Sequence, residues 1–351
     1  MAEVLCRARS YAASALTLAA CATGAGAPAA EELAPFLPGD RSAPAPDTRP
    51  QVVFFPRFGN PADDARGSLG PGVVLSNDGI GPHSAALWMH DTVDPSRVAG
   101  DVAVLSTHGD DAYAQPLYAA ARFNSVQTAL IPRDAPQSDL ETVASWLADA
   151  EIVFLADGDR ASYAAWAGGP VAAAVRAVYD RGGVIAAAGG GAAALGVALL
   201  VPRGVPDVPS NVALDDPYAA TIALVPGPFA LPSAGSWIVD VSLRSADRFG
   251  RLAAMTARAQ ADGLVVGQAV AALGIGLDDG AALAIDRRGT ATLLPSDAAT
   301  GGDCWLIRGG GAAQVAPGQA LVWSGASVTR FDAPERPSNC PTGAGPPSRT
   351  P

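Results

Sequence analysis

Few side chains in this sequence can take up or release a proton near neutral pH. The 351 residues include only three histidines, His83, His90 and His108. His83 and His108 each follow a predicted strand, and the same strand ends carry the aspartates Asp78, Asp157 and Asp159. These acids could pair with His83 or His108 as an alternative acid–base site, but no metal-ligand spacing is present, so we expect no metal site. His90, on a predicted helix, is expected at the surface.

The elements that position these groups alternate between apolar, strand-like runs and helical stretches. Strands are predicted at 51–55, 72–76, 101–106, 126–131, 151–156 and 184–188, and helices at 83–90, 112–123, 138–148, 171–180 and 192–200. We expect Ser138 to cap its helix. Beyond residue 202, strands are predicted near 238–242, 281–285 and 320–323, with one helix at 246–261. This order predicts an α/β fold with a doubly wound, mostly parallel sheet, helices on both faces and a β-rich C-terminal part.

One stretch after the 184–188 strand resembles a nucleophile elbow. Residues 182–196 read G-G-V-I-A-A-A-G-G-G-A-A-A-L-G, where the cyanophycinase and dipeptidase-E-like serine hydrolases have G-G-V-I-G-G-T-S-A-G-A-x-x-L-G. Other landmarks in family order are F-L-A-D-G-D-R at 154–160, W-A-G-G-P at 166–170, D-D-P-Y at 215–218, D-V-S-L-R-S-A-D-R-F-G-R-L at 240–252 and G-I-G-L-D-D-G at 274–280. The resemblance covers about residues 70–310. It implies a flavodoxin-like fold of the class I glutamine amidotransferase type.

The resemblance places three catalytic positions on this chain. Gly189 stands at the nucleophile position, Ser242 at the base position and Asp279 at the acid position. Glycine offers no nucleophile, and a serine hydroxyl does not titrate near neutral pH. Because loss of a single triad member typically costs several orders of magnitude in rate, the family's mechanism should not operate here. The chain is therefore interpreted as a pseudoenzyme.

Part of the implied pocket remains. Backbone N–H groups of Gly190 and Gly158 should still point at the oxyanion position, with Asp157 and Arg248 beside them. Such a pocket is expected to bind a peptide or carboxylate ligand without cleaving it. Two alternatives stay open: an active hydrolase with Ser242 or Ser76 as nucleophile and His83 or His108 as base, and an envelope scaffold that has no small-molecule pocket.

Three arginines follow the Ser242 position. Arg248 and Arg251 match arginines of the family, in which such residues hold acidic substrates or brace the histidine loop, whereas Arg244 does not. We expect all three to form ion pairs, with Asp240, Asp247 and Asp279 as the partners.

The N-terminal residues resemble an export signal. Residues 1–20 combine Arg7 and Arg9 with a short apolar stretch, and L-A-A-C at 18–21 resembles a bacterial lipobox. We expect Cys21 to be lipidated and to anchor an exported protein in the bacterial cell envelope, facing the periplasm or the surface. Residues 21–50 should form a Pro- and Ala-rich tether, 51–332 the folded domain and 333–351 a Pro-rich tail.

Two cysteines follow the predicted lipidation site. In an oxidising compartment, Cys304 and Cys340 are expected to form one disulfide that ties the tail to the domain.

Charge and composition exclude other classes. The 23 basic residues are all arginine and the 34 acids leave a net charge of −11, so no basic surface for nucleic acid is expected. The glycines at 189–191 do not match a dinucleotide-binding motif, and we expect no cofactor.

Overall fold

The computed structural model describes residues 51–332 except 64–69, 80, 82, 96, 266–270, 298–301, 310–312, 315 and 324–325. Contacts divide the chain into Met1–Pro46 and Asp47–Pro351, and all described residues belong to the second unit. The predicted signal peptide, Cys21, the tether, the tail and Cys340 lie outside the described residues. Among the described helices, none is long and apolar enough to cross a membrane.

The larger sheet has nine strands, and its centre is parallel. Across the sheet, the parallel strands are β5 (Ser125–Leu130), β4 (Asp101–Ser106), β6 (Ile152–Leu155), β7 (Val184–Ala188) and β3 (Gly72–Ser76). Antiparallel strands flank them: β1 (Val53–Phe54) and β2 (Phe58–Gly59) pair with β5, β12 (Ala282–Ile285) pairs with β3, and β13 (Ala291–Leu293) pairs with β12. Strands β3, β4, β6 and β7 are buried along their whole length, which explains their continuous apolar sequences.

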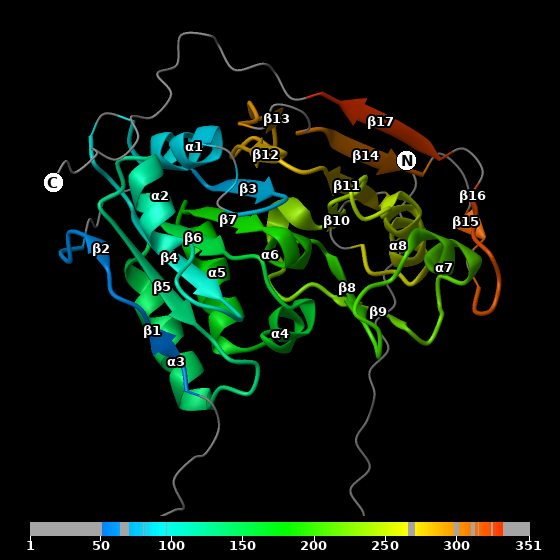
Figure 1. Cartoon of the computed structure of the whole chain (residues 1–351), viewed down its shortest axis with the longest axis horizontal. Helices are drawn as coiled ribbons and strands as arrows, with labels where there is room; N and C mark the ends of the chain where they lie inside the picture. The colour runs from blue at the N-terminus through cyan, green and yellow to red at the C-terminus, as the bar shows by residue number, and fades with distance from the viewer. Residues whose placement is uncertain are drawn as a thin grey trace, which may run out of the picture. The chain divides into compact units, whose positions relative to one another are not determined.

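Helices cover both faces of this sheet (Figure 1). On one face, α1 (His83–Val93) and α2 (Ala114–Ala120) pack against a core that includes Val104 and Phe154. On the other face, α3 (Gln137–Trp146), α5 (Pro170–Asp180) and α6 (Gly189–Ala194) pack against a core that includes Leu105 and Leu155. The short helix α4 (Arg160–Ala165) follows β6. The prediction of a doubly wound, mostly parallel sheet is confirmed.

A second sheet is built from the C-terminal half of the chain. Its order is β10 (Trp237–Val241), β11 (Leu273–Leu277), β14 (Cys304–Arg308) and β17 (Ser327–Phe331), with only β10 and β11 parallel. One face joins the core of the larger sheet through Val241 and Leu277. The other face packs Ile238 and Ile307 against α8 (Phe249–Ala261), which lies beside α7 (Ser210–Asp215). The pairs β8 (Ala198–Pro202) with β9 (Ile222–Pro226) and β15 (Ala313–Gln314) with β16 (Val322–Trp323) complete the predicted β-rich part.

Differences from the predicted elements lie where distant parts of the chain meet. The single helix predicted at 192–200 is in fact the end of α6, a turn at Gly196 and strand β8. A Cβ atom on Gly196 would lie 2.9 Å from the carbonyl oxygen of Trp237, so the close approach of β10 ends the helix there. Helix α8 begins at Phe249 rather than 246, because Asp247 has a φ of +50°, which is incompatible with helical geometry.

Other boundaries differ by less. The predicted cap at Ser138 is wrong, because α3 begins at Gln137 and Pro136 occupies the N-cap. Helix α2 is shorter than predicted, and the six-residue helices α4 and α7 were missed because they are too short for a periodic signal.

The predictions for two single residues, His90 and Cys304, do not agree with the structure, which buries both. His90 is 4% exposed, and its ring contacts the Asp91 carboxylate and the Arg97 carbonyl at 3.0 and 2.8 Å, so the surface prediction is wrong. Cys304 is 1% exposed and is a free thiol, whose pKa burial raises to about 12. The predicted disulfide with Cys340 is therefore not supported.

Glu151, just before β6, makes the stability of this sheet depend on pH. Its carboxylate accepts a hydrogen bond from the Asp101 backbone N–H at 2.8 Å, and burial raises its pKa to about 7 from 4.5. Because the folded pKa is the higher one, its contribution to stability is complete below pH 4.5 and is lost as pH rises through about 7. Glu151→Gln should therefore unfold at higher urea concentration than the wild type at pH 8, by about 1–2 kcal/mol after allowance for solvent screening, with little difference at pH 4.5.

The exposed Glu141→Gln change on α3 is the matched control and should not alter the pH profile. An equal effect of Glu151→Gln at both pH values would contradict this account.

Candidate functional site

The carboxyl end of β7 leads directly into α6 at Gly189. Ala188 still has extended backbone, with φ −123° and ψ 151°, whereas Gly189 has φ +53°. The chain thus makes the sharp strand-to-helix turn on which α/β hydrolases expose a nucleophile. Glycine adopts the positive φ without the cost that a side chain would add.

The side chain of Asp157 occupies the space beside this turn. Its Oδ1 accepts a hydrogen bond from the Gly190 backbone N–H at 2.7 Å. A Cβ atom added at Gly189 would overlap this carboxylate. The expectation that the Gly190 N–H points at a ligand is therefore corrected, because Asp157 already takes that donor. The backbone N–H of Asp157 donates in turn to the Tyr113 hydroxyl at 3.2 Å, and burial and the Asp157 charge raise the pKa of Tyr113.

Glycines allow the loop of Asp157 to lie against α6. A Cβ atom on Gly190 would overlap the carbonyl oxygen of Gly158, and one on Gly158 would overlap the Thr107 hydroxyl. Next in the loop, Asp159 caps α4 and accepts hydrogen bonds from two backbone N–H groups and from the Ser162 hydroxyl. Burial raises the pKa of Asp159, but these hydrogen bonds outweigh it and the pKa lies below its usual value. Both aspartates of the loop therefore have partners within the protein.

An asparagine bridges Ser242 and Asp279, the two residues expected from the sequence at the base and acid positions. Ser242, just after β10, donates its backbone N–H and its hydroxyl to Oδ1 of Asn77 at 2.7 and 3.0 Å. The Asn77 amide donates to Asp279 at 2.8 Å, and the Ser245 hydroxyl donates to the same carboxylate oxygen at 3.1 Å. Asn77 thus joins Ser242 to Asp279, which do not bond to each other directly. None of these groups supplies a base for chemistry at Gly189.

A cavity of about 390 Å³ opens at this end of the sheet. It brings together eight of the residues selected from the sequence, namely Asp78, Asp157, Gly158, Asp159, Gly189, Gly190, Ser242 and Arg248. Its other lining residues are Asn77, Arg160, Pro202, Pro206, Asp207 and Val241. Asp279, His83 and His108 do not line it. The cavity is therefore polar and carries charges of both signs.

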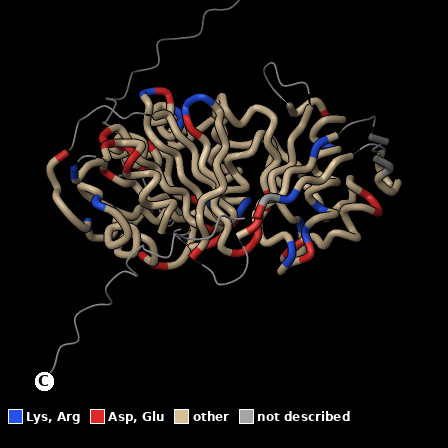
Figure 2. The backbone as a smooth tube through the Cα atoms, turned by 90° about the horizontal axis from the view of Figure 1, so that it is seen from above, with Lys and Arg blue, Asp and Glu red and all other residues tan. Residues whose placement is uncertain are grey.

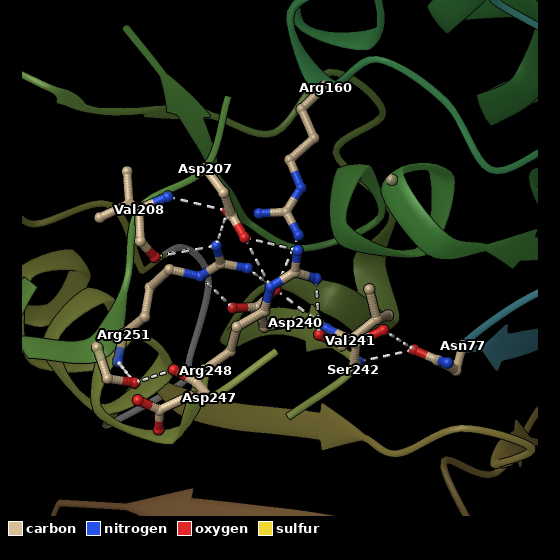
Figure 3. A network of polar contacts seen from close by, with 12 residues as sticks. Asn77, Arg160, Asp207, Val208, Asp240, Val241, Ser242, Asp247, Arg248 and Arg251 are labelled. Atoms are coloured by element: carbon tan, nitrogen blue, oxygen red, sulfur yellow. Dashed lines mark hydrogen bonds and ion pairs between the residues drawn. The ribbon is translucent and has the colours of Figure 1, made fainter. Parts of the chain in front are cut away.

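A mostly buried network of arginines and aspartates lies beside the cavity, and three of its members line it, namely Arg160, Asp207 and Arg248 (Figure 3). The Arg251 side chain is fully buried and donates through Nε and Nη2 to Asp240 at 2.7 Å, and it also pairs with Asp207. Arg160 reaches Asp240 from α4 at 2.8 Å, and Arg248 pairs with Asp207 at 2.7 Å. Burial raises the pKa of Asp240, but the charges of Arg160 and Arg251 lower it by more, so the pKa lies well below its usual value. Elsewhere the strands of both sheets are nearly free of charge (Figure 2).

The predicted ion pairs of the three arginines are right in kind, but two of the named partners are wrong. Arg251 pairs with Asp240 as expected, whereas Arg244 pairs with Asp278 and Asp303 at 2.6 Å each, and not with Asp279. Arg248 pairs with Asp207, and no described arginine pairs with Asp247.

Sequence reasoning missed Asp207, Arg160 and Asn77 as members of the site. Asp207 lies in a Pro-rich loop that carries no motif, so no local signal marks it. Arg160 directly follows the D-G-D motif, and Asn77 lies in the turn after β3, at the same sheet edge as Gly189. The one sequence signal that could have identified Arg160 and Asn77 is that each follows the carboxyl end of a parallel strand.

The structure does not join the alternative nucleophiles, Ser76 and Ser242, to the alternative bases, His83 and His108. The Ser76 hydroxyl is buried and donates to the Ala187 carbonyl at 3.1 Å. The Ser242 hydroxyl donates to Asn77, and within the described part of the chain no hydrogen bond joins either serine to His83 or His108. Both histidines are exposed, and the described residues contain no cluster of His, Cys, Asp and Glu that could hold a metal.

No protein-family model matches this sequence, and no curated protein matches it. Among solved structures, the chain is similar to a peptidase from an acI-B1 Actinobacterium, with 12% identity, a TM-score of 0.39 and coverage of 76% of this chain and 99% of that one. It is also similar to a candidate peptidase E protein from Listeria monocytogenes EGD-e, with 8% identity, a TM-score of 0.40 and coverage of 64% of this chain and 98% of that one. At TM-scores below 0.5, neither similarity identifies the family or the activity of this chain.

The overlap at Gly189 predicts that a serine is not tolerated there alone. Gly189→Ser should lower the free energy of unfolding by about 2–4 kcal/mol, because it adds a strained positive φ and a clash with Asp157. Adding Asp157→Gly should recover at least half of this loss. Urea denaturation of the single and double variants measures both effects.

Gly79→Ser is the matched control, because Gly79 has φ +49° and no atom within 4 Å of a built Cβ. Gly79→Ser should lower the free energy of unfolding by about 1 kcal/mol, because it adds only the strain of a positive φ. If Gly189→Ser costs no more than this control, Asp157 does not obstruct the position.

Proposed function

We propose that this chain is a non-hydrolytic ligand-binding protein with a fold like that of the peptidase E and cyanophycinase-like serine hydrolases. The observation that carries the proposal is the Asp157 carboxylate, which lies beside Gly189 where a nucleophile side chain would begin and takes the Gly190 N–H. An oxyanion formed near Gly189 would meet a negative charge and an occupied donor, the opposite of what acyl transfer requires. The hydrogen bonds of Ser242 to Asn77 support the same conclusion.

The ligand we propose is a peptide end or a small carboxylate-bearing molecule. A cavity of about 390 Å³ lies within the range of small-molecule sites, roughly 300–1,000 Å³. Its lining combines guanidinium groups, carboxylates and an amide, which suits a polar ligand with several hydrogen-bonding groups. A thermal-shift series with dipeptides tests for binding directly.

The native protein should not hydrolyse dipeptides, and a serine-reactive phosphonate should leave it unlabelled. The triple variant Asp157→Gly, Gly189→Ser, Ser242→His should become labelled, because it removes the obstruction and restores a nucleophile and a base. Position 242 accepts histidine, since its φ of +56° lies in a region that histidine adopts more readily than most residues. Mass spectrometry of the labelled protein locates the modified residue.

The double variant Gly189→Ser, Ser242→His, which retains Asp157, is the matched control and should be labelled more slowly by at least tenfold. Labelling of the native protein that disappears in Ser242→Ala would overturn the proposal and favour a relocated nucleophile.

We also propose that the protein is exported and held in the cell envelope through a lipid on Cys21. The support is the L-A-A-C sequence at 18–21, preceded by a short apolar stretch and two arginines. Produced in a bacterium, the protein should partition into the detergent phase of a Triton X-114 extract. Cys21→Ala should move it to the aqueous phase or leave it unprocessed, whereas Cys6→Ala, the control, should change nothing.

A further inference from the structure

The charged network beside the cavity contains more positive than negative charge. It consists of three guanidinium groups, Arg160, Arg248 and Arg251, and two carboxylates, Asp207 and Asp240. The arginine side chains are 12%, 19% and 0% exposed, so the excess charge is poorly solvated. Asp240, the carboxylate partner of Arg160, is shared with Arg251, so an anion in the adjacent cavity would add a counter-charge for Arg160.

Arg160 is the network member that has donors to spare. Arg248 uses Nε and Nη2 for Asp207 and Nη1 for the Val241 carbonyl. Arg251 likewise bonds through all three of its nitrogens. Among the described residues, Arg160 makes one hydrogen bond, from Nη2 to Asp240, and its Nε and Nη1 have no partner. Because Arg160 also lines the cavity, these free donors are available to a ligand there.

The aspartates that line the cavity also restrict the charge that a ligand can carry. Asp159 and Asp207 are engaged by the α4 cap and by two arginines. Asp157 has one hydrogen bond to a backbone N–H, and the exposed Asp78 carboxylate has no partner among the described residues. A ligand with a second negative charge would be repelled by Asp78 and Asp157, whereas an ammonium group would be attracted.

We propose that Arg160 binds the carboxylate of a small zwitterionic ligand, an amino-acid-like molecule, in this cavity. The Nε and Nη1 groups of Arg160 hold the carboxylate, and Asp78 and Asp157 favour the ammonium group. This inference rests on the proposed function, because it assigns the ligand class of the same cavity. It differs from the expectation from the sequence, which placed the carboxylate on the Gly190 N–H.

Saturation-transfer NMR with four matched probes tests the charge requirement: alanine, propionate, n-propylamine and succinate. The wild-type protein should bind alanine most tightly and succinate most weakly. Arg160→Gln should weaken alanine and propionate by roughly tenfold or more, the worth of a hydrogen bond to a charged group, and leave n-propylamine unchanged. Arg160→Lys, which keeps the charge, should retain most of the affinity for propionate. Arg258→Gln, which removes a guanidinium that does not line the cavity, is the control and should change none of these.

The possible outcomes of this experiment test different parts of the inference. If the wild type binds none of the four probes, this inference fails, and the thermal-shift series with dipeptides decides separately whether the proposed ligand site fails as well. If Arg160→Gln binds propionate as the wild type does, only the role of Arg160 fails. If Arg160→Gln loses n-propylamine as well, the cavity has been disturbed and Arg160→Lys decides: retained propionate binding supports the inference, and its loss overturns it.

Discussion

The buried pair of Arg251 with Asp240 is the contact on which the site depends. Arg251 comes from α8 and Asp240 from β10, and through them the pair gathers Arg160 from α4 and Asp207 from the loop after β8 (Figure 3). A fully buried guanidinium is tolerated only when carboxylates satisfy its donors, and removal of one partner of such a pair typically costs about 3–5 kcal/mol. Helix α4 and the loop after β8 are thereby fixed against β10 and α8 at one end of the sheet. The cavity wall is consequently set by electrostatics more than by apolar packing.

A second constraint links Gly189 and Asp157, because the two residues compete for the same space. Glycine at 189 leaves the space that the Asp157 carboxylate fills, and that carboxylate in turn excludes a side chain at 189. The carboxylate thus lies beside the backbone N–H that an oxyanion at this turn would need. A serine introduced at position 189 alone would meet this carboxylate.

Charges of both signs in one small cavity give it a selectivity that neither sign gives alone. The chain as a whole carries a net charge of −11, which discourages polyanionic ligands, yet Arg160 offers donors that no residue described here uses. A ligand that carries both charges meets both conditions at once. This distinction arises from which donors and acceptors the protein itself leaves unsatisfied, and counting charged residues would not reveal it.

The sequence by itself determined the parallel strands of the larger sheet and the order of its layers. Strands 72–76, 101–106 and 184–188 were predicted with their true bounds, because burial on both faces leaves an uninterrupted apolar run that needs no tertiary information. Tertiary structure alone decided that Asp157 fills the Gly189 position, that Asn77 joins Ser242 to Asp279, and that His90 and Cys304 are buried. Each of these rests on a close approach between segments distant in the chain, and a local pattern of residue types carries no information about such distances. The same reason hid Asp207 in its proline-rich loop until α8 brought Arg251 and Arg248 against it.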